Sequence, residues 1–495
     1  MATSSTRSNP APVVYFGAPR LIRLLDGWAD QPGGLSTRLA EALRQLVRAG
    51  QLPAGTRLPS ERILASALGL GRTTVGQAFD TLRAEGILVS RTGTGTFVST
   101  AAGHANARGD DRLRSFVTDT LVAGPRGTRQ LNARIDLRSA ALPGIPMVAD
   151  ELDRLSAADF AGTLPSHGYV PRGLPVLRTA VASYYTALGL RTDPGQVLVT
   201  SGAQQAMRIV AETLVEPGGT VIVEEPTFRG AIEVLRSVGA HLVGVPSGRE
   251  GVDIDALAAA VRRHRPVFAL LQSTVHNPTG SVLPERARAA VARLSAEAGL
   301  TIVDDAAPTD AIIDGPPPPP LASYGGDVLT LGSASKGFWG GLRVGWLRAG
   351  RDLVERLAIV KGAEDLGTSI PAQIVTARLL DRAAEARAHR RATLGSARDF
   401  ALQILAEELP DWRSYVPAGG ASLWIELPAG HSATTFTERA GRAGVDVLAG
   451  PTFSCEDALD GWLRVAFAAP EDVIADGLLR LAELWHAGKD EDRMT

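Results

Sequence analysis

The lysine content of this 495-residue chain is its first chemical signal, because only three lysines occur among 51 basic residues. Lys336 lies in the string GSASKGFWGGLRVGW, with Ser333 and Ser335 before it and Arg343 seven residues after it. A lysine amine forms an imine with a carbonyl compound, whereas a guanidinium does not. A lysine kept here, in a chain that otherwise uses arginine, predicts covalent chemistry at Lys336. The alternative is a surface lysine beside a glycine-rich turn.

Polar residues also follow strand-like apolar runs elsewhere. TSGAQQAM follows the run QVLVT and opens a helix, so that the backbone N–H groups of Ala203 and Gln204 are placed to bind a phosphate. IVDDAAPTDAIIDG ends a strand with Asp304 and Asp305. Further strings of this kind are EEPTFRG with Phe228, HNPTG with Asn277 and WLRVAFA with Arg464. Taken singly, most of these strings are explained as well by a helix cap, a turn or a surface ion pair.

In this order, over about 260 residues, the strings resemble those of the fold-type-I aminotransferases that use pyridoxal 5′-phosphate (PLP). The resemblance implies an aldimine between Lys336 and PLP. It also implies that Asp305 pairs with the ring nitrogen, because the family aspartate lies nine residues before the aspartate of a DG, here Asp314. The other roles that it implies are phosphate binding by Ala203, Gln204, Ser333, Ser335 and Arg343, ring stacking by Phe228, a hydrogen bond from Asn277 to the phenolate oxygen, and a grip on a ligand carboxylate by Arg464.

Two positions depart from the family pattern. A tyrosine that donates to the phenolate oxygen is common two or three residues after the ring-nitrogen aspartate, where this chain has Ala307 and Pro308. A partner-subunit tyrosine that touches the phosphate is expected near SHGYVPRG, but Tyr169 is offset by one position. These departures predict a poorer catalyst than an aminotransferase.

The N-terminal part has a different character. Helical periodicity predicts helices over residues 20–29, from 35 to Gly50, from Pro59 and over 72–85, followed by two short strands around a TGTG turn. Residues 36–98 hold eight arginines against four acidic residues, a basic excess that suits nucleic acid. The order of elements is that of a winged helix-turn-helix.

The segment LPAGTRLPSERILASALGLGRTTVGQAFDTLRAEGILVSRTGTGTFV is similar to the winged helix of the GntR family. The resemblance implies that residues at the start of the helix over 72–85 contact base edges and phosphates in a major groove. It also implies that the preceding helix contacts the DNA backbone and that the wing tip approaches the DNA. The predicted DNA-binding residues are Arg72, Thr73 and Thr74 on the recognition helix, Arg62 before it, and Thr92 and Gly93 at the wing tip. The alternative is a three-helix module used only for docking.

Composition and the positions of turn-forming and loop-forming residues predict a multidomain protein. We expect a disordered tail over 1–19, a GntR-type winged-helix domain over 20–100, a linker over 101–132, and an α/β fold-type-I aminotransferase-like domain over 133–490 that ends in a small α+β subdomain. One cysteine permits no internal disulfide and no thiolate metal cage, and no metal site is predicted. The absence of a signal-peptide pattern and of an apolar run long enough for a membrane helix predicts a cytoplasmic protein.

The whole pattern resembles MocR/GabR-type regulators, which join a GntR winged helix to an aminotransferase-like domain. The resemblance implies a domain-swapped homodimer that binds a double-stranded DNA operator, carries PLP and senses PLP or a small amino compound. A working aminotransferase with an accessory DNA-binding domain is one alternative. A plain repressor whose C-terminal domain only dimerises is the other. The effector, the operator and the sign of regulation are not given by the sequence.

Overall fold

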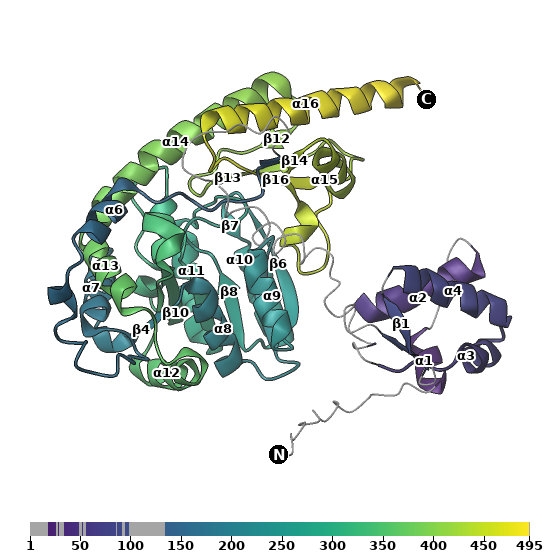
Figure 1. Ribbon diagram of the computed structural model, residues 1–495, viewed down its shortest axis with the longest axis horizontal. Helices are drawn as coiled ribbons and strands as arrows, with labels where there is room; N and C mark the ends of the chain where they lie inside the picture. The colour runs from purple at the N-terminus through teal and green to yellow at the C-terminus, as the bar shows by residue number, and fades with distance from the viewer. Residues whose placement is uncertain are drawn as a thin grey trace, which may run out of the picture. The chain divides into compact units, whose positions relative to one another are not determined.

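The computed structural model describes residues 18–25, 28, 34–48, 52, 56–85, 87–91, 95–98 and 134–494. The chain divides into two compact units, an N-terminal unit over residues 1–128 and a C-terminal unit over 129–495 (Figure 1). The predicted linker and most of the predicted tail lie outside the described residues. No helix in the described part of the chain is long and apolar enough to cross a membrane.

The N-terminal unit consists of α-helices followed by a hairpin. Its elements are α1 (Ala18–Leu24), α2 (Leu35–Arg48), α3 (Glu61–Leu68), α4 (Arg72–Ala84), β1 (Leu88–Arg91) and β2 (Gly95–Val98), with β1 and β2 antiparallel. The Ser60 side chain accepts a hydrogen bond from the N–H of Ile63, and α3 ends at Gly69, whose φ is 68°. The first helix begins and ends earlier than the predicted 20–29, and Pro19 lies in its first turn, where a missing N–H costs no hydrogen bond.

One face of α4 forms part of the interior of the N-terminal unit. Val75, Ala78, Phe79 and Leu82 are all buried, and they pack with buried leucines of α2. Complete burial of a large apolar side chain contributes about 1.5–3 kcal/mol. This packing leaves the opposite face of α4, with Arg72 and Thr73, exposed.

A mixed eight-stranded sheet forms the centre of the C-terminal unit. Its order is β4-β11-β10-β9-β8-β5-β6-β7, in which β10, β9, β8, β5 and β6 are parallel to their neighbours in that run, whereas β11 is antiparallel to β4 and β10, and β7 is antiparallel to β6. The strands are β4 (Val197–Thr200), β5 (Thr220–Glu225), β6 (His241–Gly248), β7 (Gly251–Val252), β8 (Phe268–Leu271), β9 (Thr301–Asp305), β10 (Asp327–Ser333) and β11 (Gly345–Arg348). The apolar run QVLVT and the strand expected to end with Asp304 and Asp305 are β4 and β9.

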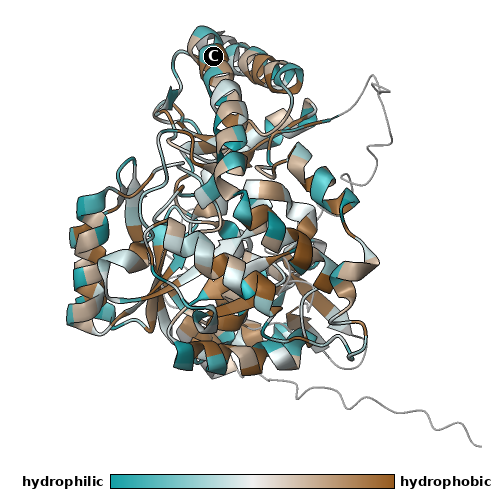
Figure 2. Cartoon of the chain, turned by 90° about the vertical axis from the view of Figure 1, so that its left-hand side faces the viewer, coloured by the Kyte–Doolittle hydropathy of each residue, from teal (hydrophilic) through white to brown (hydrophobic). Residues whose placement is uncertain are grey.

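Helices surround this sheet. They are α6 (Pro146–Asp153), α7 (Pro175–Ala187), α8 (Ala203–Leu214), α9 (Arg229–Ser237), α10 (Ile254–His264), α11 (Glu285–Ala298), α12 (Arg351–Asp365) and α13 (Ile370–Asp381). Figure 2 shows hydrophobic and hydrophilic residues alternating along the helices, as expected for helices with one buried face. The fold is therefore the predicted α/β arrangement.

A smaller α+β subdomain follows. An antiparallel sheet β12-β13-β16-β15 is covered by α15 (Ala433–Arg442), α16 (Glu471–Met494) and the long helix α14 (Ala383–Glu408), which lies beside α16 (Figure 1). Its strands are β12 (Arg413–Ser414), β13 (Ser422–Glu426), β15 (Leu448–Ala449) and β16 (Trp462–Ala466). A separate parallel pair joins β14 (Val445–Asp446) to β3 (Ile135–Asp136). The start of the C-terminal unit is thus fixed to its last subdomain, which the sequence did not predict.

Candidate functional site

Lys336 lies directly after β10, in the π-helix Ser335–Trp339. A π-helix is rare and occurs mostly as a single turn at functional sites. The half-buried side chain points its amine toward the segment that follows β3, where Nζ donates to the carbonyl oxygen of Ala140 at 2.7 Å. The amine is therefore held inside the C-terminal unit.

The carboxylates of Asp304 and Asp305 end β9 on opposite faces, as successive strand residues must. Asp304 accepts from the backbone N–H and the hydroxyl of Ser273. Asp305 accepts from Gln272 Nε2 at 3.0 Å and from the N–H of Ala307. Burial raises the pKa of Asp305 to about 6, while the charge of Lys336 acts in the opposite direction. The charge of Lys336 thus acts on the pKa of Asp305, whereas the charge that lowers the pKa of Asp304 is that of Arg288.

Gln272 connects two of the predicted residues, and the sequence reasoning missed it. Besides donating to Asp305, it accepts at Oε1 from the N–H of Asn277 at 3.0 Å. Asn277 Oδ1 in turn accepts from Arg464 Nη1 at 3.2 Å. A polar residue at the end of β8, five positions before the asparagine of HNPTG, was the available signal. Asp305, Gln272, Asn277 and Arg464 thus form one continuous chain of hydrogen bonds.

Arg464 lies on β16 and is buried. Its Nη2 donates to the carbonyl oxygen of Arg138, and its guanidinium carbon lies 4.9 Å from the ring centre of Phe453. A guanidinium over an aromatic face, with one edge in hydrogen bonds, is oriented for bidentate binding of a carboxylate. The hydrogen bond to the Arg138 carbonyl ties Arg464 to the same 138–143 segment that receives Lys336.

The predicted phosphate-binding residues also converge. The helix α8 begins at Ala203, so its first N–H groups have no partner within the helix. Arg343 Nη2 donates to the carbonyl of Ser201 at 3.0 Å, and a Cβ on Gly202, whose φ is 101°, would meet this guanidinium at 3.2 Å. The Ser333 hydroxyl donates to that of Ser335 at 3.0 Å. Hydroxyls, an arginine and a helix N-terminus are an established combination for an anion.

Phe228 and Gln204 meet over Gly230. A Cβ on Gly230 would lie 2.6 Å from the Phe228 ring and 2.8 Å from Gln204 Oε1, so only glycine fits beneath them. Gln204 also donates to the carbonyl of Gly230 at 2.9 Å. The aromatic ring is therefore fixed beside the start of α8.

No tyrosine hydroxyl replaces the donor that is missing at Ala307 and Pro308 among the described residues nearby. The Tyr184 hydroxyl donates to Asp310, and the Tyr185 hydroxyl accepts from Trp346 Nε1. Tyr169 is 59% exposed and lies against His167. Neither Tyr184 nor Tyr185 is thus free to take the place of a tyrosine at 307 or 308.

In the N-terminal unit, Arg62, Arg72 and Thr73 are exposed and Thr74 is half-buried. The predicted wing-tip residues Thr92 and Gly93 lie outside the described residues. Arg57, which the sequence reasoning did not single out, is exposed and pairs with the wing strand β2, where a Cβ on Gly95 would lie 3.0 Å from its Nε.

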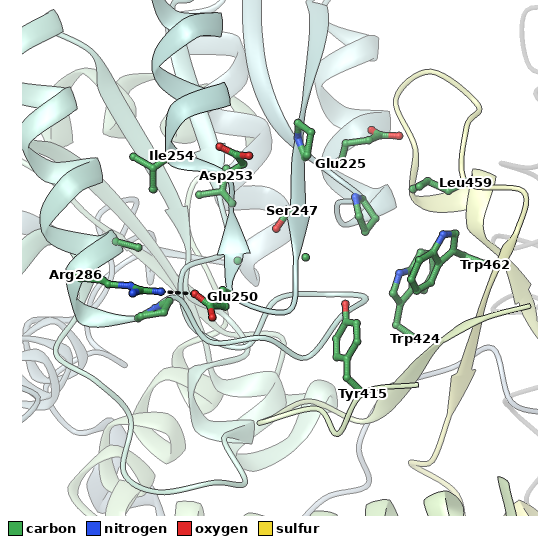
Figure 3. A pocket seen from close by; sticks show the side chains of 17 residues that line it. Glu225, Ser247, Glu250, Asp253, Ile254, Arg286, Tyr415, Trp424, Leu459 and Trp462 are labelled. Carbon is green, nitrogen blue, oxygen red and sulfur yellow. Dashed lines mark hydrogen bonds and ion pairs between the residues drawn. The ribbon is translucent and has the colours of Figure 1, made fainter. Parts of the chain in front are cut away.

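A separate cavity of about 540 Å³ lies between β6, β7 and the C-terminal subdomain (Figure 3). The stacked rings of Trp424 and Trp462 form one wall. Its carboxylates are already bonded, since Glu250 pairs with Arg286, Asp253 caps α10 and Glu225 accepts from the N–H of Cys455. The described residues that line it include none of the predicted cofactor or effector residues.

Comparisons with known proteins agree with both units. Residues 147–480 match the family "Aminotransferase class I and II", and residues 35–98 match "Bacterial regulatory proteins, gntR family". The chain is 30% identical over 407 residues to an uncharacterized HTH-type transcriptional regulator, YisV, of Bacillus subtilis, covering 79% of this chain and 84% of the relative. It is 31% identical to the probable rhizopine catabolism regulatory protein MocR of Rhizobium meliloti, covering 66% of each chain.

Among solved structures, the α-aminoadipate aminotransferase LysN of Thermus thermophilus, complexed with N-(5′-phosphopyridoxyl)-L-leucine, is 30% identical. It superposes with a TM-score of 0.64 and covers 72% of this chain and 92% of that structure. The fold of the C-terminal unit thus has a parallel in an aminotransferase. The match over residues 147–480 places the protein in the aminotransferase class I and II family. Because a GntR-family domain precedes this fold in the same chain, the protein belongs to the MocR/GabR-type transcriptional regulators.

Proposed function

We propose that this protein is a PLP-dependent, DNA-binding transcriptional regulator that senses PLP or an amino compound at Lys336. The observation that carries the proposal is the hydrogen-bonded chain from Asp305 through Gln272 and Asn277 to Arg464, in which the charge of Lys336 lowers the pKa of Asp305 against the larger effect of burial. It provides a ring-nitrogen partner, a phenolate donor and a carboxylate partner in one site. The GntR-family unit supplies the output.

The residues present fit the cofactor. The space beside Gly202, which a Cβ would fill, together with Arg343, Ser333 and Ser335, suits a phosphate at the N-terminus of α8. Lys336 would hold the aldehyde, Phe228 would cover the ring and Asp305 would keep a proton on the ring nitrogen. Once bound, PLP supplies an aldehyde and an electron-withdrawing ring.

The proposed effector is an amine that carries a carboxylate. Such a carboxylate would compete for Arg464 with its present acceptors, the Arg138 carbonyl and Asn277 Oδ1. The effector amine would also release the Lys336 amine, which in its free form donates to the carbonyl of Ala140. Both changes act on the 138–143 segment, which follows the linker in the sequence. A ligand alters DNA binding only through a difference in its affinity for two states, typically worth about 1–3 kcal/mol.

A homodimer with exchanged DNA-binding units and a cytoplasmic location are further parts of the proposal. The match of the C-terminal unit to the aminotransferase family supports the dimer. Sedimentation of the full chain at several concentrations tests the dimer. A monomer at micromolar concentration would contradict it.

A working aminotransferase is the second candidate, favoured by the likeness to an α-aminoadipate aminotransferase. Ala307 and Pro308 argue against it, since they leave Asn277 as the only identified side-chain donor to the phenolate oxygen. The deciding experiment adds candidate amino acids and amines to the full chain with PLP. The visible absorbance of the cofactor, binding to a DNA fragment selected from a random library, and keto-acid production are followed together.

The regulator proposal expects a spectral change coupled to a change in DNA affinity, with slow turnover or none. Turnover at about 1–1,000 per second, with unchanged DNA binding, would favour the aminotransferase. A colourless protein that does not bind PLP would favour a repressor whose C-terminal unit only dimerises. Arg464→Met is the matched variant, because it should lose the response to carboxylate-bearing amines while it keeps the cofactor.

A further inference from the structure

Arg390 has an unusual environment for a buried cation. It lies on α14 and is 3% exposed. Two other arginines of the same helix have carboxylate partners, since Arg387 pairs with Asp310 and Arg398 with Asp314. None of the ion pairs among the described residues includes Arg390. An unpaired buried charge costs several kcal/mol unless hydrogen bonds compensate it, so its bonds must account for its presence.

Every hydrogen bond that the Arg390 side chain donates in the described structure goes to a backbone carbonyl. Nε lies 2.9 Å from the oxygen of Lys336 and 3.2 Å from that of Gly337. Nη2 lies 2.8 Å from the oxygen of Phe338 and 2.7 Å from that of Pro143. Burial lowers the pKa of the guanidinium to about 10, which keeps it charged near neutral pH. One planar group thus holds three consecutive carbonyls of the π-helix.

The fourth bond of Arg390 reaches the segment that receives the lysine amine. Pro143 lies three residues after Ala140, whose carbonyl accepts from Lys336 Nζ. The N–H of Ile145 also donates to the carbonyl of Phe338 at 3.3 Å. The guanidinium therefore fixes both the backbone of Lys336 and the backbone of the acceptor of its amine.

We propose that Arg390 is a positioning residue for Lys336, which fixes the π-helix and the Ala140–Pro143 segment relative to each other and so sets where the amine meets the cofactor. This inference rests on the proposed role of Lys336. A guanidinium suits the task because its rigid planar fork donates in several fixed directions, whereas a lysine ammonium is a single point on a flexible stem. Displacements of about 1 Å at a reacting group are enough to cost up to a hundredfold in rate.

The test compares the full-length wild type with Arg390→Lys and Arg390→Gln. Arg398→Lys is the matched control, since Arg398 is also a buried arginine of α14 that donates to a carbonyl, that of Pro417. The first measurement is the pH midpoint of the visible cofactor band. The second is the rate of cofactor release after dilution, and the third is the unfolding temperature without cofactor.

For Arg390→Lys we expect release about tenfold faster than in the wild type, and a midpoint shifted by at least about half a pH unit. Arg390→Gln, which also loses the charge, should show the larger change, and Arg398→Lys should match the wild type in both. Equal midpoints and release rates in Arg390→Lys and Arg398→Lys would overturn the proposal. Failure of both Arg390 variants to fold would also overturn it, by making Arg390 a residue of the fold alone.

A wild type that binds no PLP would overturn the proposed function and this inference together. That result is separable from the others, because it is seen before any variant is made.

Discussion

The two units use arginine in opposite ways. In the N-terminal unit, Arg62 and Arg72 project into solvent from α3 and α4. In the C-terminal unit, Arg288, Arg390 and Arg464 are buried and donate to backbone carbonyls or neutral side chains. An exposed guanidinium stays available to bind a polyanion, whereas a buried one fixes the geometry of the groups to which it donates. The first arrangement suits DNA, and the second suits a small and exactly shaped ligand site.

Ion pairs sharpen this contrast in the N-terminal unit. Arg44 pairs with Glu41 and Glu85, and Arg83 pairs with Glu61 and Asp80. Two arginines thus take up all four acidic residues counted in the sequence between 36 and 98. None of the ion pairs in the described part of this unit involves Arg62 or Arg72. The basic excess is therefore left on the arginines outside these pairs, among them the two predicted DNA contacts.

The largest expected effect concerns the covalent site. Lys336→Ala should abolish the visible absorbance of imine-bound cofactor, while the N-terminal unit keeps its fold and its DNA binding. Lys361 is unsuited to this role because it is fully buried in an ion pair with Asp365. Borohydride reduction of the wild type, followed by peptide mapping, should label the peptide that contains Lys336. A label on Lys361 or Lys489 would refute the assignment.

The next expected effect is a dependence of the stability of the C-terminal unit on pH. Burial raises the pKa of Glu224 to about 8 and lowers that of His276 to about 4, so their 3.6 Å contact joins two neutral groups near pH 7. A raised carboxyl pKa means that the folded state binds the proton more tightly. Its contribution to stability is full below about pH 4.5 and is lost as the pH rises through 8.

Glu224→Gln should remove this loss, because an amide resembles the protonated carboxyl. Relative to the wild type, the variant should gain on the order of 3 kcal/mol in the free energy of unfolding between pH 5 and pH 9. Denaturation followed by tryptophan fluorescence reports mainly on the C-terminal unit, which holds six of the seven tryptophans. Parallel pH profiles in the two proteins would show that Glu224 is ionised in the folded state.

Sequence reasoning predicted features that neighbouring residues determine, and it missed most features that depend on contacts between residues far apart in the chain. The helices of the N-terminal unit and the strands β4 and β9 could be predicted because periodicity and turn residues are local signals. The choice of Asp305 over Asp304 came from family spacing and stays a prediction, while the structure shows that the two carboxylates have different partners. The roles of the individual site residues stay predictions until they are tested by substitution.

Gln272 lies only five residues before its partner Asn277 and was overlooked. Arg390 and β3, in contrast, escaped prediction for a physical reason. Their partners lie far away in sequence, as in the bonds from Arg464 to Arg138 and from Arg390 to Pro143, which span 326 and 247 residues. A buried arginine that binds carbonyls has no sequence pattern of its own. β3 is only two residues long, and it exists because Val445 and Asp446 offer it an edge.

A smaller effect tests the exposed arginines. Arg72→Ala should cost about 1–3 kcal/mol on the preferred DNA sequence and bring its affinity toward that for scrambled DNA. Arg62→Ala should weaken binding to all sequences alike and reduce the salt slope by about one. Both side chains are exposed, so unfolding temperatures should not change. Competition binding at several salt concentrations measures these effects, and an unchanged preference in Arg72→Ala would contradict base contact.

The smallest effect probes the ion pairs. Arg83 Nη2 lies 2.8 Å from Glu61 Oε1, joining α4 to α3, and the side chain is 27% exposed. Arg83→Gln should therefore cost only about 0.2–1 kcal/mol in stability, as is usual for partly exposed pairs. Its charge is already neutralised by Glu61 and Asp80, so the substitution should leave the salt slope of DNA binding unchanged, in contrast to Arg62→Ala. Equal reductions of the slope in the two variants would mean that Arg83 also meets phosphate, and that charge in this unit is not divided between helix packing and DNA.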